Sequence, residues 1–543
     1  MDNAQICKEF AAHVTARQNI NGLFDLIERY VVPFRTEVYT QVTSENVVNW
    51  RDRGIFDGTA ITANEILSSS IHGSLTSMAT KWFSLRFRQD ELNEDYDAML
   101  WAQESEDIIF ETLQDSNFDV ETSEFYLDLT SFGTSIITEE IESELSWEGV
   151  TFNAIPINNC YFDVDFKGKV CKFFRKIEWT KSEIKTKFKL EDEQLPDCLK
   201  NQQDQTKKHT IIFCIYKRNY KYEDTGEKLA PKSRPYGFKY VLEQDKEILG
   251  EEGGYYEMPS YVTRWRKSSV SNWGFSPAFV AMPDILTVNQ ITEDTLEALG
   301  KVIDPATLTT RRGLLSDLDL GRAGLTVVRS MDDIKPYESN ARFDVGEVKI
   351  KNLQDAINRA FHVNQLMLKD SPAMTATEVQ VRYELMQRLL GPTLGRLQND
   401  FLDPLVKRTF NALYRSGQLP KMPQIVEDMQ GYMNIEYVGP MARAQKRQVA
   451  VSMLNWIGNI GQYAEVFPEA LDIPDVDKIT RELGTLEGVS AKFMRSVSDI
   501  DKRRKEREAQ IQERMAAEQL GAEGEARKVQ AEANVIEQEA VNE

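Results

Sequence analysis

The chain has 543 residues, 41% apolar and 28% charged. This globular composition excludes extended disorder, and the length predicts several domains. Asp and Glu number 86 against 65 Lys and Arg, a net charge of −21, which argues against a protein that wraps nucleic acid over its whole surface. DNA that passes through a protein without adhering to it stays compatible with this charge.

Several kinds of chemistry lack their usual signatures. Five scattered cysteines without a CxxC pair predict no disulfide framework and indicate a reducing compartment. We expect no signal peptide, and no membrane span because no run of about 18 apolar residues occurs. There is no phosphate-binding loop, no GxSxG elbow and no zinc-type His/Cys cluster. A structural protein without cofactor or metal is favoured over an enzyme, although carboxylate-based sites leave no reliable signature.

The first half of the chain predicts helices followed by strands. Apolar residues recur at helical spacing over 61–82 and again over 99–132, where Gly133 closes the second helix. From Thr134 to about residue 270, runs rich in Ile, Val, Phe and Tyr are typical of strands: TSIITEEI, VTFNAIPI, KVCKFFRKIEW, TIIFCIYKRNY and FKYVLEQ. Residues 165–168, DFKG, predict a hairpin turn between two of them.

One helix is predicted on each side of a small insert. Ser276 and Pro277 predict the start of the first, as N-cap and first-turn residues, and Gly300 its end. We expect Pro283 to bend this helix. Its apolar face is formed by Ile285, Val288, Leu296 and Leu299. Residues 302–345 predict a compact insert of strands and turns, and helical spacing returns over 347–367.

The strongest periodic signal follows a loop that contains Pro372. Thr375 and Glu378 fit a capping box. The apolar stripe behind it steps by three or four residues, which predicts a buried face: Val379, Tyr383, Met386, Leu390, Leu394, Leu397, Phe401 and Leu405. We expect a kink at Gly391–Pro392 and an end by Gly417.

The C-terminal part of the chain contains two regions of different composition. Residues 421–500 predict a smaller helical unit punctuated by prolines. From Asp501 the chain is nearly all Arg, Lys, Glu, Gln and Ala, with small residues on a heptad seam at 522–536. This segment predicts either a helix stabilised by copies of itself or a solvated tail.

This order of elements resembles the portal proteins of short-tailed bacteriophages, the head-to-tail connector family. The resemblance is carried by IHGSLTSMATKWFSLRF (71–87), PSYVTRWRKSSVSNWGFSPA (259–278), DPATLTTRRGLL with LGRAGLTVV (304–328) and MTATEVQVRYELMQRLLGPTLGRL (374–397). The last stretch is the most specific. Trp273 and Phe275 stand where the family pattern has Tyr and Arg. The likeness covers about residues 60–500.

The resemblance implies a mainly helical α+β fold with wing, stem, clip and crown, and a C-terminal helical barrel. The implied segments are 1–275 (N-terminal wing), 276–301 (first stem helix), 302–345 (clip), 346–367 (second stem helix), 368–375 (channel loop), 376–418 (long kinked wing helix), 419–500 (crown) and 501–543 (C-terminal helix or barrel).

The resemblance also implies a function, that of a twelve-subunit ring at one capsid vertex of the virion. Double-stranded DNA would enter through the ring during packaging and leave at infection, without sequence specificity. The implied partners are other copies of the chain, the major capsid protein, the terminase packaging motor, and tail adaptor and tail proteins, with a scaffolding protein as a further candidate. Assembly would take place in the host cytoplasm, and no membrane is involved.

Three implied segments contain candidate functional residues, most of which are basic. Those for the DNA channel are Lys349, Lys351 and Arg359 on the second stem helix, with Lys369, Asp370, Ser371 and Met374 in the channel loop. Each charge could instead form a solvated or inter-subunit ion pair, and the loop could be an ordinary connection. Candidates for docking the motor and then the tail are Arg311, Arg312 and Arg322 in the clip, with salt bridges between inserts as the alternative.

Other readings of the sequence remain open at this stage. Trp265 and Trp273, beside Arg264 and Arg266, could indicate nucleic-acid contact, but a packed core before the stem is favoured. Competing functions are a phage DNA-packaging enzyme, such as an ATPase or nuclease, and an internal scaffold or ejection protein. The first would require a nucleotide or metal cluster, and the second would be more helical in its middle.

Overall fold

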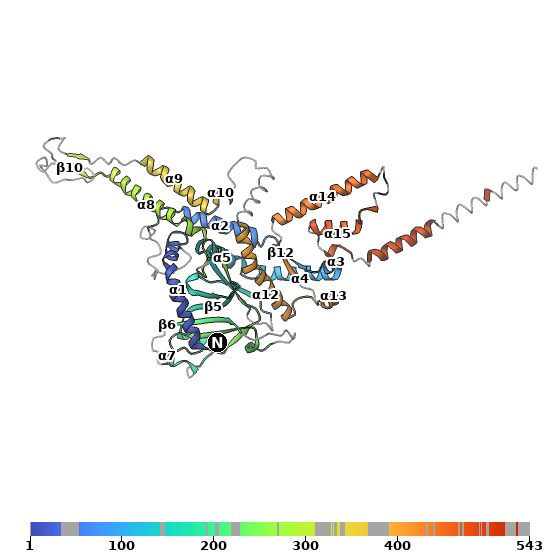
Figure 1. The fold of residues 1–543 in the computed structure, drawn as a ribbon, viewed down its shortest axis with the longest axis horizontal. Helices are drawn as coiled ribbons and strands as arrows, with labels where there is room; N and C mark the ends of the chain where they lie inside the picture. The colour runs from blue at the N-terminus through green and yellow to red at the C-terminus, as the bar shows by residue number, and fades with distance from the viewer. Residues whose placement is uncertain are drawn as a thin grey trace, which may run out of the picture. The chain divides into compact units, whose positions relative to one another are not determined.

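The chain divides into two compact units, each built from two separate stretches. The computed structural model describes residues 2–33, 54–141, 147–191, 194–200, 206–218, 229–268, 271–309, 327, 330, 334–336, 343–366, 390–429, 433–437, 440–464, 467, 469, 472–487, 489, 491–495, 499–515 and 528–529. Unit 1 comprises Met1–Trp82 and Ile109–Gln418, and unit 2 comprises Phe83–Ile108 and Leu419–Glu543. The described residues are mostly helical, with several antiparallel sheets (Figure 1).

Between residues 134 and 264, the described part of unit 1 contains two antiparallel sheets. In the three-stranded sheet, β2 (Thr134–Ile141) lies between β3 (Val150–Ala154) and β9 (Ser260–Arg264). The five-stranded sheet runs in chain order through β4 (Cys160–Val164), β5 (Val170–Thr180), β6 (Lys208–Lys217), β7 (Tyr236–Leu242) and β8 (Gly253–Tyr255). The predicted turn at 165–168 is confirmed, because the Gly168 amide donates to the Asp165 carbonyl at 2.8 Å. The short strands β4, β8 and β9 were not predicted.

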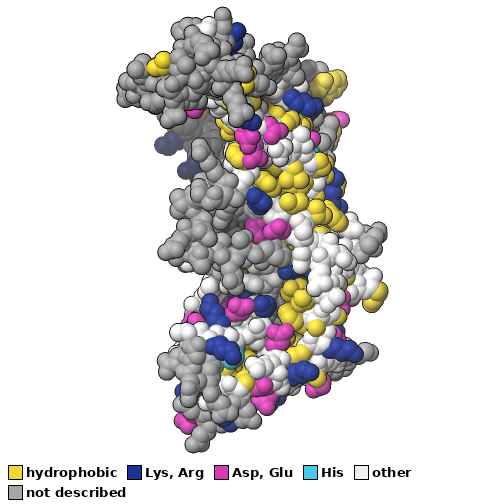
Figure 2. Space-filling view, turned by 90° about the vertical axis from the view of Figure 1, so that its left-hand side faces the viewer, with side chains coloured by type: hydrophobic (Ala, Val, Ile, Leu, Met, Phe, Trp, Pro, Cys, Tyr) yellow, Lys and Arg dark blue, Asp and Glu magenta, His cyan; other side chains and the backbone are white. Residues whose placement is uncertain are grey.

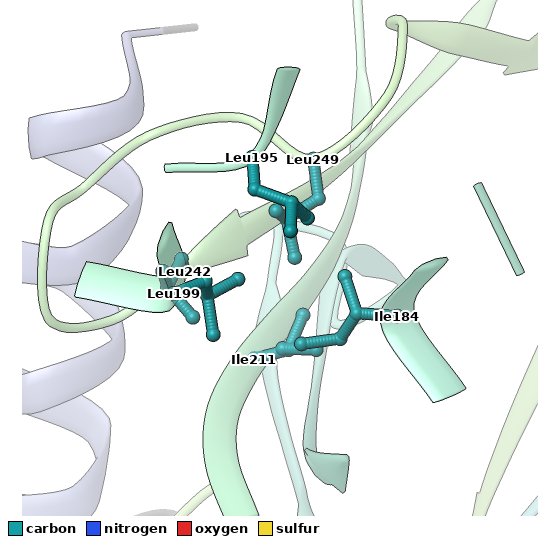
Figure 3. Close-up of a cluster of buried hydrophobic side chains, with 6 residues drawn as sticks. All are labelled: Ile184, Leu195, Leu199, Ile211, Leu242 and Leu249. Atoms are coloured by element: carbon teal, nitrogen blue, oxygen red, sulfur yellow. The ribbon is translucent and has the colours of Figure 1, made fainter. Parts of the chain in front are cut away.

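Helices cover the five-stranded sheet of unit 1. On one face, Phe10 of α1 (Asn3–Tyr30) packs edge-on against Tyr161, with ring centroids 5.1 Å apart. On β6, Cys214 is the residue paired with Phe174 of β5. Ile211 lies three residues before Cys214, and because neighbouring side chains of a strand alternate between faces, it points to the opposite face of the sheet. There it joins a small core with residues of α6 (Lys181–Phe188) and α7 (Asp197–Lys200), shown in Figure 3: Ile184, Leu195, Leu199, Ile211, Leu242 and Leu249.

The three-stranded sheet packs against helices from both ends of unit 1. α5 (Phe118–Phe132) contacts β2 and β3. On α12 (Asp403–Ser416), the buried Arg408 lies 3.3 Å from the carboxylate of Glu139 on β2. Glu139 also accepts hydrogen bonds from the hydroxyls of Tyr261 and Thr409. Burial raises the pKa of Glu139, against the opposing effects of Arg408 and these two donors.

The predicted apolar stripe is confirmed where it is described. Leu390, Leu397, Phe401 and Leu405 are buried, and Leu394 is half-buried. The helix contains a π-helical turn at Gln398–Leu402, directly before Pro404. Because proline has no amide hydrogen, it cannot donate a hydrogen bond to the preceding turn of the helix. A π-helical turn, which is wider than an α-helical turn, accommodates this missing bond. The turns that would define a bend at Pro392 lie outside the described residues, so the predicted kink there stays a prediction.

Unit 2 contains helices and one two-stranded sheet. β1 (Phe83–Phe87) pairs antiparallel with β12 (Met433–Tyr437). Its described helices are α3 (Asp90–Glu94), the N-terminal part of α4 (Tyr96–Asp115), α13 (Gln424–Asp428), α14 (Pro440–Ala464), α15 (Val476–Glu487) and a helix over residues 499–515. The helix predicted over 61–82 was too long, because α2 (Thr59–Leu75) ends well before β1 begins.

The segment after Asp501 is helical in its described part, over residues 499–515, and all of these side chains are exposed except Ile500. Its start is attached to α15 by Arg504, whose guanidinium donates to both carboxylate oxygens of Asp477 at 2.6 and 2.7 Å. Apart from 528–529, the predicted heptad seam lies outside the described residues.

Candidate functional site

The helix predicted at Ser276 is present as α8 (Pro277–Ile303). Ser276 is the N-cap, and its hydroxyl oxygen accepts from the Ala278 amide at 3.2 Å. The expected end at Gly300 is wrong, because the helix continues to Ile303. A glycine ends a helix when it adopts a positive φ, and Gly300 does not; its carbonyl instead accepts from the Asp304 amide at 2.9 Å.

The first turn of α8 is fixed to the end of α5 by two glycines. Gly133 adopts φ +73°, and a Cβ there would lie 2.6 Å from the Ser276 amide nitrogen. A Cβ on Gly274 would collide with the carbonyl oxygen of Gly133. The Ser276 hydroxyl also donates to the Ser131 carbonyl. This close backbone approach determines where α8 leaves the body of unit 1.

The two tryptophans before α8 belong to the core, as the favoured reading of the sequence held. Trp265 is 2% exposed and Trp273 is 8% exposed. The buried Arg17 of α1 lies over the Trp273 ring and donates to the carbonyls of Ile157 and Asn158 at 2.7 and 3.0 Å. These aromatic residues are therefore not available to stack on nucleic-acid bases.

The second helix of the pair is α9 (Phe343–Ala360), which lies beside α8 (Figure 1). The two run antiparallel: Gly346 faces Thr295 near one end, while Gln354 and Asn289 both bind Asp57 near the other. The helix predicted over 347–367 is not continuous. His362, at φ +59°, separates α9 from the short α10 (Val363–Leu366).

The insert between the two helices contains a small antiparallel ladder. β10 (Thr307–Thr309) pairs with β11 (Ile334–Pro336), in agreement with the strands predicted there. The docking candidates Arg311, Arg312 and Arg322 lie outside the described residues. So do the channel-loop candidates Lys369, Asp370, Ser371 and Met374.

The three candidates on α9 are all exposed, but they do not share one face. At about 100° per residue, Lys351 and Arg359 lie about 80° apart, on the side opposite the buried Leu353 and Ile357. Lys349 lies on the flank, about 40° from Leu353. Arg359 therefore lies between the other two round α9, about 80° from each, whereas Lys349 and Lys351 are about 160° apart.

The apolar face of α8 is buried at its start and exposed at its far end. Ile285 and Val288 are buried against unit 1, whereas Leu296 is 52% exposed and Ile303 is 75% exposed. Sequence periodicity could not distinguish these halves, because the same pattern continues along the whole helix. An exposed apolar face of this kind is typical of a surface that binds another protein.

The described surface on one face of the molecule has mixed charge. On the face drawn in Figure 2, basic and acidic side chains of the described residues are interspersed, with hydrophobic side chains between them. Across the described segments, no helix is long and apolar enough to cross a membrane, and no three metal-ligating side chains cluster.

Comparison with known proteins places the chain in a family. Residues 3–494 match the family described as bacteriophage head to tail connecting protein, and the chain belongs to that family. It is 26% identical over 490 residues to the portal protein of Salmonella phage epsilon15, covering 87% of this chain and 86% of that protein. It is 24% identical over 512 residues to a "probable portal protein" of Bordetella phage BPP-1, covering 92% and 90% of the two chains.

One solved structure with a similar chain is the virion of a native gene transfer agent particle. The match covers 74% of this chain and 86% of that chain, at 10% identity and a TM-score of 0.34. A similarity at this level carries no argument about the architecture.

Proposed function

We propose that the chain is a portal protein, whose copies form a ring-shaped channel at one capsid vertex for the packaging and ejection of double-stranded DNA. The observation that carries this proposal is the α8–α9 pair: two long antiparallel helices, joined by an insert that begins and ends in a β ladder, within a member of the head-to-tail connecting family. The exposed apolar end of α8 supports assembly into a larger particle.

In this proposal residues 1–275 and 376–418 form the wing, residues 276–301 and 346–367 the stem, residues 302–345 the clip and residues 419–500 the crown. Residues 501–543 form a C-terminal helix or a helical barrel in the ring. The chain works as a structural connector rather than an enzyme. Its partners are the major capsid protein, the terminase motor and then tail proteins, with a scaffolding protein as a candidate during assembly in the host cytoplasm. The finished ring is part of the virion.

Lys349, Lys351 and Arg359 on α9 are our candidates for basic positions that centre the DNA, together with Lys369 in the channel loop. The loop from Lys369 to Met374 is the proposed constriction, and Arg311, Arg312 and Arg322 the proposed motor and tail contacts. An acidic chain supports this function, because repulsion between the wall and the phosphates lets DNA move. Lys369→Glu should impair packaging or DNA retention, and an unchanged result would remove Lys369 from the channel.

Negative-stain electron microscopy together with the mass in solution tests the proposal. We expect a ring with an open centre, with a mass near twelve copies of the 62.3 kDa chain, about 748 kDa. A compact, closed particle of a few subunits would contradict it. ATP hydrolysis by the purified chain with Mg²⁺ would favour a packaging enzyme instead.

A further inference from the structure

The second half of α14, in unit 2, is uncharged and largely exposed. No charged residue occurs from Val449 to Ala464, although 28% of the chain is charged. α14 packs beside α15 (Figure 1), and Ala450 and Ile460 are buried. On either side of these two residues, apolar side chains remain exposed. Exposed apolar surface that is gathered on one element is typical of a site that binds another protein.

One flank of α14 carries a stripe of large apolar side chains. Val449, Trp456 and Tyr463 follow one another at intervals of seven residues and are 50%, 44% and 66% exposed. Seven residues make nearly two helical turns, so the three side chains lie within about 40° of one another round the helix. Trp and Tyr are among the residue types that contribute most to binding at protein interfaces. We call these three residues the aromatic stripe.

The opposite flank of α14 has room for such side chains. It contains Leu454, Gly458 and Gly461, the glycine stripe, and Leu454 and Gly458 each lie about 160° round the helix from Trp456. Leu454 is 50% exposed, and a Cβ on either glycine would meet nothing within 4 Å. Glycine is unfavourable inside a helix, and packing within the subunit does not require it at these two positions. The close approach of another molecule would require it.

In a ring, the two stripes of neighbouring copies would meet at the same level. Rotation about a ring axis leaves heights unchanged, and Trp456 stands between Leu454 and Gly458, about 3 Å from each along the helix. The Trp456 side chain of one copy would therefore face the gap between Leu454 and Gly458 of the next. The absence of charge suits such a partner, because each copy carries −21 and acidic surfaces would repel each other.

We propose that α14 of one subunit binds α14 of the next through a seam in which the aromatic stripe of one copy packs into the glycine stripe of the other. The contact is heterologous, since different flanks of the two copies meet, and the inference rests on the proposed ring. A flank about 24 Å long and about 10 Å wide offers less than the about 800 Å² per partner of a stable interface. The seam is therefore one part of the ring contact, and its loss should weaken assembly without abolishing it.

Filling the glycine stripe tests the seam. Gly458→Leu places a large side chain where Trp456 of the next copy would enter, so it should raise the subunit concentration needed for half-assembly, measured by mass photometry, by about tenfold. The unassembled subunit should unfold at an unchanged or higher temperature, because leucine is a better helix former than glycine. Gly22→Leu makes the same change on the exposed side of α1, where a Cβ also meets nothing within 4 Å, and should assemble like the wild type. Normal assembly of Gly458→Leu, or equal defects in the two variants, would overturn the seam.

Cysteine cross-linking gives a second readout that leaves Trp456 and both glycines in place. Val451, 51% exposed, lies about 160° round α14 from Val449. A bis-maleimide should join Val449→Cys/Val451→Cys subunits into a ladder of covalent oligomers beyond the dimer, because every copy then carries both ends of the contact. A mixture of the two single variants should stop at dimers. Rings without the ladder would overturn the seam but keep the proposed function, whereas a wild-type chain that forms no rings would count against the function itself.

Discussion

Arg408 and Glu139 form a fully buried ion pair between α12 and β2 in unit 1. Removing one partner of a buried pair leaves an uncompensated charge, which costs about 3–5 kcal/mol. We therefore expect Arg408→Met to lower the thermal unfolding temperature clearly. Arg415→Met is the matched control, because Arg415 lies on the same helix and pairs with Glu257 at 2.7 Å, but at a partly exposed site. A similar fall in unfolding temperature in both variants would show that burial does not make the Arg408–Glu139 pair more important than the partly exposed one.

The same pair gives a pH dependence. The folded-state pKa of Glu139 is raised by burial, so the folded state binds its proton more tightly than the unfolded chain does. Stability from such a group is present below the unfolded pKa and is lost as pH rises through the folded pKa. Without Arg408 the pKa rises further. The Arg408→Met defect should accordingly be smaller near about pH 5 than near about pH 8, as measured by thermal unfolding. An equal loss of stability in Arg408→Met at the two pH values would contradict the proposed role of the Glu139 pKa.

Two glycines of the α8 region should respond in opposite directions to alanine. Gly274→Ala forces a Cβ onto the Gly133 carbonyl and should destabilise unit 1 by about 1–3 kcal/mol. Gly300→Ala meets nothing within 4 Å in the interior of α8 and should stabilise that helix by about 0.5–1 kcal/mol. Thermal unfolding of both variants measures these two effects. A Gly274→Ala protein as stable as the wild type would show that the backbones at Gly133 and Gly274 do not approach closely.

At the scale of elements, the sequence predicted those with strong local signals. The Ser276–Pro277 cap, the turn at 165–168 and the strands β2, β5, β6 and β7 were found because capping, turn chemistry and residue preference act within a few residues. The pairing of β1 with β12 was missed. Each strand has five residues, and their partners are far apart in sequence. No sequence pattern within a few residues indicates such a pairing.

The candidate site was predictable in its placement but not in its orientation. The sequence placed Lys349, Lys351 and Arg359 on one helix, and helical geometry fixes the angles between them, but the sequence does not show which side of α9 meets α8. That side is set by tertiary packing, through Gly346 and Thr295. The exposure of Leu296 depends likewise on where the body of unit 1 ends, which periodicity does not show.

The helix over 499–515 should be released from α15 by salt or acid. Its described attachment includes the Arg504–Asp477 pair, and Arg504 holds the pKa of Asp477 below the ordinary value of 3.8. A lowered folded pKa contributes stability above the unfolded pKa that is lost as pH falls through the folded one. Asp477→Asn should therefore accelerate trypsin cleavage within 499–515, as high salt should in the wild type. Glu487→Gln on the same helix should not, and equal rates in the two variants would contradict the attachment.

For the whole molecule, the net charge of −21 predicts weak adhesion to DNA. We expect the purified protein to bind double-stranded DNA with a Kd weaker than about 1 µM, and with little change between about 50 and 200 mM salt, because few counterions are released. Fluorescence anisotropy of a labelled duplex measures both. Tight binding with a steep salt dependence would indicate a continuous basic surface and would contradict a low-friction wall.

The β1–β12 pairing has a consequence for biosynthesis. Phe83, Leu85 and Phe87 of β1 are buried in the folded protein, but their strand partner begins at Met433. At about 5–20 residues per second, a ribosome needs on the order of tens of seconds to reach that partner. During this interval the nascent chain exposes an apolar strand with unpaired backbone groups, a template for wrong pairing. Chaperone binding near residues 83–87 is therefore expected on ribosome-bound chains, and it should cease once β12 has left the exit tunnel.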